Sequence, residues 1–346
     1  MTGPTGVGDD RMPVVDVHAH LLLPALHAEV ERRAPQEVAE AADLERRRNG
    51  IESLKASGAM IGARIPKLTD VGARLAAMDE QGVHRQWVSV SPNHFYPWAS
   101  EGLAGWVASE TNRLIAEHVA QAPDRLVGLG VVPLQHPERI VEYLDDAVLG
   151  RGLAGVEISS FAGDVELSDE RLEPFWARAA ELGCVVFLHP FGCSLDERLD
   201  RFYLSNTVGQ PTENAVALSH LIFAGVLDRH PDLKIVAAHG GGYLPFAIGR
   251  SDRAWHVRPE AHRCEHAPSS YLRRLWFDTV VHDPVALRHL VEVAGGARVL
   301  MGSDFPFDMG SDDPITLLRS AGLPIEIERR ILGENADALV GSRVRA

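Results

Sequence analysis

Cysteine is scarce in this sequence. Its 346 residues include only three cysteines, Cys184, Cys193 and Cys264. Three scattered cysteines exclude a disulfide framework and a zinc ribbon, so we expect reduced thiols in a cytoplasmic protein. Long apolar runs are lacking as well, and the N-terminal MTGPTGVGDDRMP has neither a basic start nor an apolar stretch. The sequence therefore predicts no transmembrane helix and no secretory signal.

Basic residues are outnumbered by acidic ones. The chain has 34 Lys and Arg against 48 Asp and Glu, a formal net charge of -14. This balance disfavours nucleic acid and anionic membranes as partners, although a small anionic substrate stays open if arginines gather locally. Hydrophobic residues make up 45% and charged residues 24% of the chain, as in ordinary soluble proteins. We expect a single domain over residues 1–346, the length of an α/β barrel with insertions.

Short apolar segments alternate with helical patterns along most of the chain. Eight of them are typical of strands: VVDVHAH, VHRQWVSVSP, RLVGLGVVP, GLAGVEISS, CVVFLHP, LKIVAAHG, LRRLWFDTVV and RVLMGSD. Eight such strands alternating with helices predict a closed parallel (β/α)₈ TIM barrel rather than an open doubly wound sheet. The polar, arginine-rich segment after the first strand, residues 21–66, is predicted to be an insertion that forms a lid over the barrel mouth.

The first strand ends in two histidines, His18 and His20. Side chains alternate along a strand, so these two project to one side while Val17 and Ala19 face the other. Two converging imidazoles suit a divalent metal, which binds imidazole nitrogen at about 2.0 to 2.1 Å. A pair of surface histidines is the alternative interpretation of this motif taken alone.

Further polar residues follow other predicted strands. His189 ends the fifth, His239 the sixth and Asp304 the eighth. In a (β/α)₈ barrel, the carboxyl ends of the strands form the active site. Any one of these residues alone could serve a turn or a helix cap, but their joint placement at strand ends predicts a metal site.

These motifs resemble the amidohydrolase superfamily, of the amidohydrolase 2 type. The likeness rests on HxH in the first strand, HP after the fifth, HGGG after the sixth and GSDFPF after the eighth, and it extends from about residue 14 to residue 340. Supporting stretches are RLVGLGVVPLQHPE, AGVEI, FAGVLDRHPDLKIVAAHGGGYLPFAIGR, VVHDP and ILGENADAL. Within the superfamily, the chain is most similar to the branch of α-amino-β-carboxymuconate-ε-semialdehyde decarboxylase and related metal-dependent aromatic-acid decarboxylases.

The resemblance implies roles for the residues at the strand ends. His18, His20, His189 and Asp304 would be the metal ligands, with water completing the coordination, and His239 would be an acid/base that does not bind the metal. It further implies that no organic cofactor is needed. Three imidazoles and one carboxylate suit zinc, which we expect first, with manganese as the second choice.

The resemblance also suggests residues that contact a carboxylate substrate. Arg64 lies in the insertion, near a substrate arginine of the family, and Arg258 matches a stretch that reaches the neighbouring subunit's site, which implies a homodimer. Solvated surface arginines are the alternative for both. Phe191 stands where the branch carries a tryptophan, so an aromatic wall is kept without the indole donor. Trp98 and His282 are expected to line the barrel mouth.

Glu157, at the end of the fourth strand, has two interpretations. The favoured one is an interior carboxylate that orients His18 or His20, and the other is a ligand for a second metal. The function expected from the whole pattern is nonoxidative decarboxylation of an unsaturated or aromatic carboxylic acid, in which metal-bound water and His239 assist carbon protonation before carbon dioxide leaves. The alternative is metal-dependent hydrolysis of an amide, a lactone or a related bond.

Overall fold

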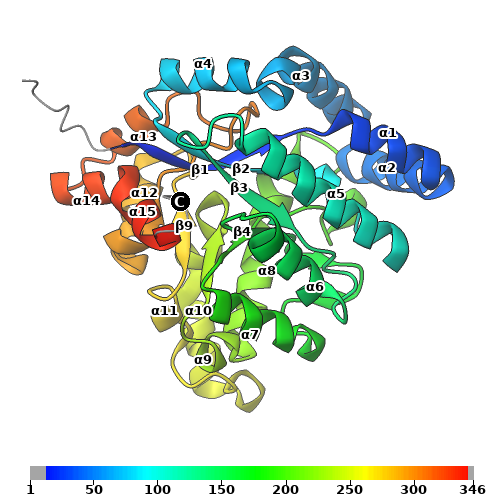
Figure 1. The fold of residues 1–346 in the computed structure, drawn as a ribbon. Helices are drawn as coiled ribbons and strands as arrows, with labels where there is room; N and C mark the ends of the chain where they lie inside the picture. Colours follow the sequence, from blue (N-terminus) through cyan, green and yellow to red (C-terminus); the bar gives the residue numbers. More distant parts are fainter. Residues whose placement is uncertain (1–12, 342–346) are drawn as a thin grey trace, which may run out of the picture.

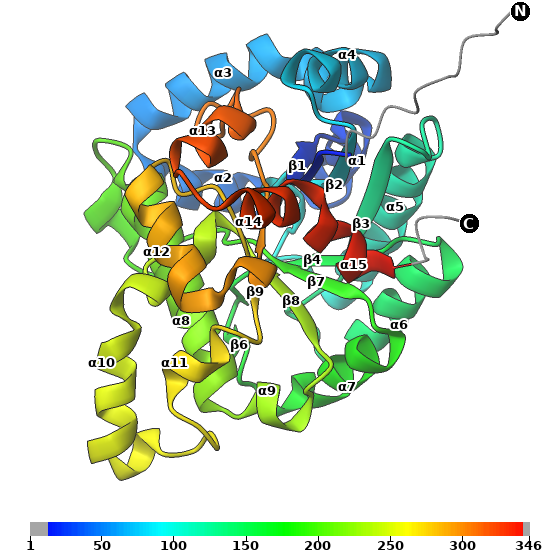
Figure 2. The same cartoon turned by 90° about the vertical axis from the view of Figure 1, so that its left-hand side faces the viewer.

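A computed structural model describes residues 13–341 of the chain. Its centre is a parallel sheet of eight strands, surrounded by helices (Figures 1 and 2). In their order around the sheet, the strands are β1 (Val15–Leu21), β2 (Arg85–Val90), β3 (Leu126–Val131), β4 (Gly155–Ile158), β7 (Val185–Leu188), β8 (Lys234–Ala237), β9 (Trp276–Asp278) and β10 (Val299–Leu300). Every one of the eight predicted strands is present. The remaining strands, β5 (Phe161–Ala162) and β6 (Val165–Glu166), form a small hairpin that the sequence did not predict.

Backbone hydrogen bonds close the sheet between its first and last strands. The Val17 amide donates to Met301 O at 2.9 Å and the His20 amide to Phe305 O at 2.7 Å. A parallel bridge between Ala19 and Phe305 continues the pairing. The structure is therefore a closed (β/α)₈ barrel, as predicted. This closure brings the two histidines of β1 beside the segment that follows β10.

Helices cover the outside of the barrel. The larger ones are α4 (Val71–Gln81), α5 (Glu101–Val119), α7 (Glu173–Leu182), α8 (Gln210–Phe223), α10 (Leu244–Val257) and α12 (Pro284–Ala294). Shorter ones are α6 (Ile140–Asp145), α9 (Val226–Arg229), α11 (Pro268–Tyr271), α13 (Pro314–Ser320), α14 (Ile325–Arg329) and α15 (Asn335–Val340). None of the helices within residues 13–341 is long and apolar enough to cross a membrane.

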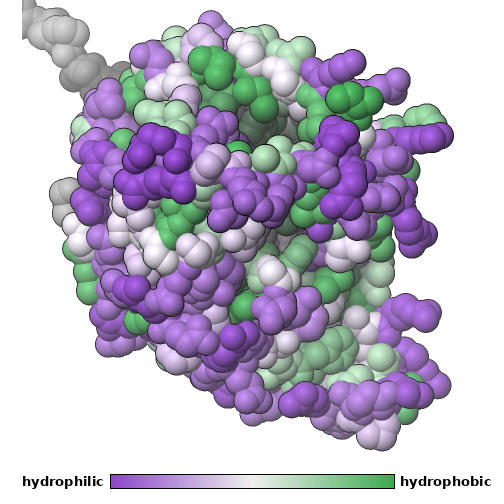
Figure 3. Space-filling view, turned by 90° about the vertical axis from the view of Figure 1, so that its right-hand side faces the viewer, coloured by the Kyte–Doolittle hydropathy of each residue, from purple (hydrophilic) through white to green (hydrophobic). Residues whose placement is uncertain are grey.

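The segment between β1 and α4 folds into three helices, α1 (Pro24–Arg33), α2 (Pro35–Asn49) and α3 (Ile51–Thr69). No residue of α2 is buried. Two of its arginines reach the segment after β7, where Arg47 pairs with Glu197 at 3.0 Å and Arg48 with Asp196 at 3.2 Å. On the face that carries α1, α2 and α5, hydrophilic side chains break up the hydrophobic areas (Figure 3). The insertion therefore contacts the barrel through these ion pairs and through an apolar cluster in which Val30 of α1 packs with Ala104 and Val107 of α5.

One end of the barrel is closed by α15. Arg85 and Lys234, the first residues of β2 and β8, bind Asp337 and the Leu339 carbonyl of this helix. Apolar side chains of the strands and α15 form one buried cluster there, including Val17, Phe187 and others such as Val15, Trp87, Val236, Leu300 and Leu339. Since α15 covers the amino ends of the strands, their carboxyl ends form the open, functional end of the barrel.

We predict that His94 makes stability depend on pH. This buried histidine follows β2, where Nε2 accepts from the Leu23 amide at 3.2 Å. Burial lowers its pKa to about 4, whereas an unfolded histidine titrates near 6.5. Between these values the unfolded chain binds more protons, so stability should fall by up to about 3 kcal/mol as pH drops from about 6.5 to 4.

Urea unfolding at pH values across this interval measures the effect. His94→Gln should flatten the dependence, although His118, with a pKa also lowered to about 4, retains part of it. An unchanged slope in His94→Gln would show that this histidine does not control the acid sensitivity.

Candidate metal centre

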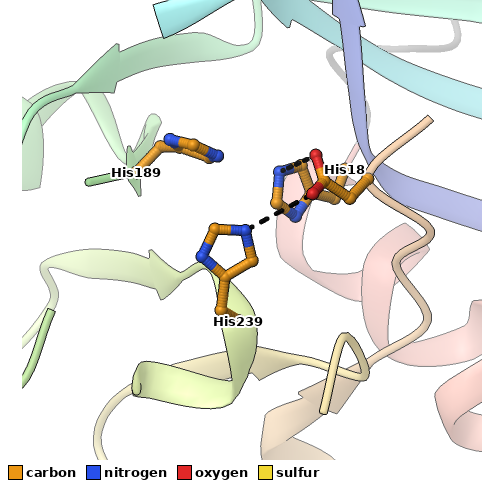
Figure 4. A group of neighbouring side chains, drawn as sticks. His18, His189 and His239 are labelled. Atoms are coloured by element: carbon orange, nitrogen blue, oxygen red, sulfur yellow. Dashed lines mark ion pairs between the residues drawn. The ribbon is translucent and has the colours of Figure 1, made fainter. Parts of the chain in front are cut away.

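Four histidines and one carboxylate meet at the carboxyl ends of the strands. His18 and His20 lie in β1, His189 directly follows β7, His239 begins the turn after β8, and Asp304 follows β10. The ligand atoms of His18, His189, His239 and Asp304 all lie within 4.8 Å of one another. Figure 4 shows the three labelled imidazole rings turned toward one common space. His20 joins the same group, since its Nε2 is 3.0 Å from His18 Nε2 and 3.1 Å from Asp304 Oδ1.

Three of these histidines are held by an acceptor at Nδ1. The partner of His18 Nδ1 is an Asp278 carboxylate oxygen at 2.6 Å, that of His20 Nδ1 is the Val90 carbonyl at 3.0 Å, and that of His189 Nδ1 is the Pro190 carbonyl at 2.9 Å. An acceptor at Nδ1 fixes the proton there, which leaves Nε2 with its lone pair free. His189 Nε2 is buried and has no hydrogen-bond partner among the described residues.

The spacing of these atoms fits a single divalent ion. Two nitrogens, each about 2.1 Å from one ion and at roughly a right angle, lie about 3.0 Å apart. This is the separation of His18 Nε2 and His20 Nε2. Two free lone pairs at that distance would repel each other, and a cation between them removes the repulsion. The donor set, imidazole nitrogens with one carboxylate oxygen, suits zinc or manganese.

His239 is bound differently from the other three histidines. Its Nε2 lies 3.6 Å from Asp304 Oδ2, and no protein acceptor holds its Nδ1 within the described residues. Its backbone has a φ of 53°, and Asp304 has a φ of 59°. Left-handed backbone costs energy at residues other than glycine and is concentrated at functional sites. The ring is therefore placed by its turn rather than by a hydrogen bond at Nδ1.

The buried charges shift one another's pKa values. Burial alone would raise the pKa of Asp304, but the surrounding histidines outweigh burial and hold it well below its usual value. Burial and the neighbouring histidines lower the pKa of His189 well below 6.5. Burial raises the pKa of the Glu157 carboxyl to about 8. The site therefore favours an ionised Asp304 and a neutral His189, the forms that bind a metal.

Glu157 does not orient the β1 histidines, contrary to the favoured expectation. The acceptors at Nδ1 are Asp278 for His18 and Val90 for His20. Glu157 is fully buried in β4, and both its carboxylate oxygens lack a hydrogen bond with good geometry in the described structure. The expectation failed because a strand-end position specifies the face of a side chain but not which neighbour it touches.

Sequence reasoning missed Asp278, which ends β9. Its Oδ2 accepts from His18 Nδ1 at 2.6 Å and from the His239 amide at 3.0 Å, while Oδ1 accepts from the Gly240 amide at 2.8 Å and the Val280 amide at 3.0 Å. A Cβ at Gly302 would lie 2.9 Å from Asp278 Cβ, so only glycine fits there. The available signal was the position of this carboxylate at the end of the predicted strand LRRLWFDTVV.

A hollow of about 480 Å³ opens beside this group. His239 and Asp304 lie at its inner end, and His282, as expected, lines it. Two predicted residues lie elsewhere. Trp98 packs on the Tyr96 ring with centroids 5.7 Å apart, and Phe191 contacts Phe95 at 6.1 Å. Neither of these rings is among the residues that line the hollow.

The structure does not bring the two predicted arginines to this hollow. Arg64, on α3, lines a separate surface depression together with Lys67, Glu80 and Pro306. Arg258 is exposed at the end of α10, where its Nε pairs with Glu260 at 2.7 Å. Among the described residues, those that line the hollow include no lysine or arginine.

Comparison with known proteins identifies the family. The amidohydrolase family matches residues 15–341. The chain belongs to this family. It is 34% identical over 275 residues to 2-amino-3-carboxymuconate-6-semialdehyde decarboxylase of Dictyostelium discoideum, covering 79% of this chain and 77% of that protein.

Solved structures of the same shape agree with this assignment. The crystal structure of 5-carboxyvanillate decarboxylase from Sphingomonas paucimobilis has a TM-score of 0.81 and 25% identity, covering 95% of this chain and 99% of that one. A 5-carboxyvanillate decarboxylase from Novosphingobium aromaticivorans, complexed with manganese and 4-hydroxy-3-methoxy-5-nitrobenzoic acid, has a TM-score of 0.83 and 20% identity, covering 96% and 97%. These likenesses support the amidohydrolase fold.

We predict that Asp278→Asn weakens metal binding. All four groups around this carboxylate are N–H donors, so the amide of asparagine must place its own N–H against one of them. Loss of such a partner typically lowers metal affinity about 10- to 100-fold. Titration of the metal-free protein with zinc or manganese measures the change. Asp313→Asn, at the cap of α13, is the matched control, and equal affinities for the two variants would refute the role of Asp278.

Proposed function

We propose that this amidohydrolase is a metal-dependent nonoxidative decarboxylase of an unsaturated or aromatic carboxylic acid. One arrangement carries the proposal. Around Asp304, three imidazoles have a hydrogen-bond acceptor at Nδ1 and a free lone pair at Nε2, whereas the fourth histidine, His239, has no such acceptor at Nδ1 within the described residues. The Dictyostelium relative is named as a decarboxylase, which favours decarboxylation over the hydrolytic alternative.

We assign His18, His20, His189 and Asp304 as the metal ligands. The Nδ1 partners of the three histidines support this assignment, because each leaves Nε2 free for the ion. Zinc is the expected metal and manganese the second choice, and the manganese in the Novosphingobium structure supports the latter. When bound, a divalent ion withdraws electron density from oxygen atoms of a substrate and holds them in place.

His239 is assigned as the acid that protonates the substrate. Its ring lines the hollow, and its Nε2 faces Asp304 Oδ2, so it can hold a proton at the inner end of the cavity. Delivery of this proton to the carbon that bears the carboxylate makes that carbon tetrahedral. The bond to the carboxylate then breaks, its electron pair restores the conjugation, and carbon dioxide leaves. Solvent returns the proton, so the reaction needs no organic cofactor.

We predict that His239→Asn keeps the metal but lowers carbon dioxide release at least about 100-fold, because the proton donor is lost. His189→Ala should lose both metal and activity. Metal analysis and a carbon dioxide assay over a panel of aromatic and unsaturated acids measure the two effects. The control is His266→Asn, an exposed histidine near α11. Loss of the metal from His239→Asn would make this histidine a ligand and contradict the assignment.

We further propose that the three-helix insertion, expected over residues 21–66 and extending to Thr69 in α3, acts as the lid of a single barrel domain. The ion pairs of Arg47 and Arg48 with the segment after β7 support this. Residues 1–12 and 342–346 of the expected domain lie outside the described part of the chain.

A homodimer in which Arg258 serves the neighbouring site also remains our proposal. Tyr243 and Phe246 are exposed and line the hollow, and Val257 is exposed near the end of α10. Figure 2 shows α10 at the edge of the molecule, where a second copy can pack. Large exposed apolar side chains close together are typical of interfaces.

Co-expression of His239→Asn with Arg258→Ala tests this arrangement. If Arg258 acts on the neighbouring site, each mixed dimer regains one intact site, and statistical mixing restores about a quarter of wild-type activity. Sedimentation measures the oligomeric state. A monomer, or mixed dimers that stay inactive, would contradict the proposal.

A further inference from the structure

The hollow beside His239 has two distinct walls. One is the start of α8 and the segment before it, which contributes Asn206, Thr207 and Gln210. The other is the segment after β9, which contributes the apolar Val280 and Val281 together with the exposed His282. Apart from His239 and Asp304, the polar side chains of the lining are therefore those of the α8 segment, Tyr243 and His282.

Most polar groups on the α8 wall are already engaged by the protein. The Thr207 hydroxyl donates to Tyr203 O at 3.3 Å, and the Tyr243 hydroxyl donates to Thr207 O at 3.0 Å. Gln210 Nε2 donates to Gly192 O at 3.5 Å. Each of these groups therefore already donates one hydrogen bond before any ligand enters.

The Asn206 carboxamide is not engaged. Its side chain makes no hydrogen bond within residues 13–341, and the residue is only partly buried, so its amide is free to contact a ligand. Gln210 follows four residues later in the same helical segment, about one turn away. Its Oε1 is a buried acceptor without a donor. That oxygen is not accessible to a ligand, so the group that this wall offers is the Asn206 amide, which both donates and accepts.

We propose that Asn206 selects a substrate that carries a neutral hydroxyl group remote from the carboxylate that leaves. Its carboxamide donates from Nδ2 to the hydroxyl oxygen or accepts the hydroxyl hydrogen at Oδ1. The inference rests on the proposed decarboxylase function and identifies Asn206 as a specificity determinant.

The consequence is discrimination between similar acids. A site built to hydrogen-bond a hydroxyl rejects an analogue that lacks it, since its own polar groups are then left unpaired. Asn206→Leu removes the donor at similar volume. It should lower kcat/KM about 10- to 100-fold for the hydroxylated acid, with little effect on the acid that lacks the hydroxyl.

The experiment compares salicylate with the dihydroxybenzoates that add one hydroxyl elsewhere on the ring. Metal-loaded wild type, Asn206→Leu and the control Asn93→Leu, an exposed asparagine outside the hollow, are assayed for carbon dioxide release and by calorimetric binding. We expect wild type and the control to prefer one dihydroxybenzoate over salicylate. Asn206→Leu should lose this preference, with metal content and melting temperature unchanged.

Two results would overturn the inference in different ways. If wild type releases carbon dioxide but Asn206→Leu keeps the same preference, or loses activity toward all these acids equally, Asn206 is not a specificity residue while the proposed function stands. If wild type neither binds nor decarboxylates any of these acids, the proposed function fails for this substrate class, and the inference fails with it.

Discussion

A buried carboxylate must be surrounded by hydrogen-bond donors, and Asp278 meets this requirement in a way that organises the whole centre. It accepts from the ring of His18 on one side and from the backbone of His239 and Gly240 on the other. The same carboxylate therefore fixes the tautomer of a proposed metal ligand and the turn that carries the proposed acid. Asp278 ends β9, which lies between β8 and β10. The relative position of His18 and His239 therefore depends on the barrel being closed.

Closure itself depends on a second buried carboxylate. Asp16 in β1 accepts from the Ser303 amide at 2.9 Å and from Gln86 Nε2 at 2.9 Å, so it joins β1 to the segment after β10 and to β2. Gln86 in turn accepts from the buried Arg74, whose guanidinium also donates to His20 O at 2.6 Å. Burial lowers the pKa of Arg74 to about 10. This charged network lies beneath the metal centre and therefore sets the positions of the two β1 histidines.

The sequence was sufficient to predict the barrel and the residues that meet at its mouth, because apolar strands that end in histidine or aspartate mark one edge of a parallel sheet. It could not reveal the partners of those residues. Asp278 ends β9 and Asp304 follows β10, yet no local pattern shows that Asp278 contacts His18. The expected strict alternation of side chains in β1 was also too simple. The pairing register shifts between Asp16 and Ala19, and the Val17 side chain packs inside the barrel. The free amide of Asn206 depends on tertiary contacts alone.

The central claim is that one divalent ion is held by the four assigned ligands while His239 stays free for proton transfer. An anomalous-difference map from crystals loaded with zinc or manganese tests this most directly. The account predicts a single peak at bonding distance from the assigned ligands, with neither His239 nor Glu157 coordinated. A peak bonded to His239, or two peaks bridged by Glu157, would contradict it and favour the binuclear, hydrolytic alternative.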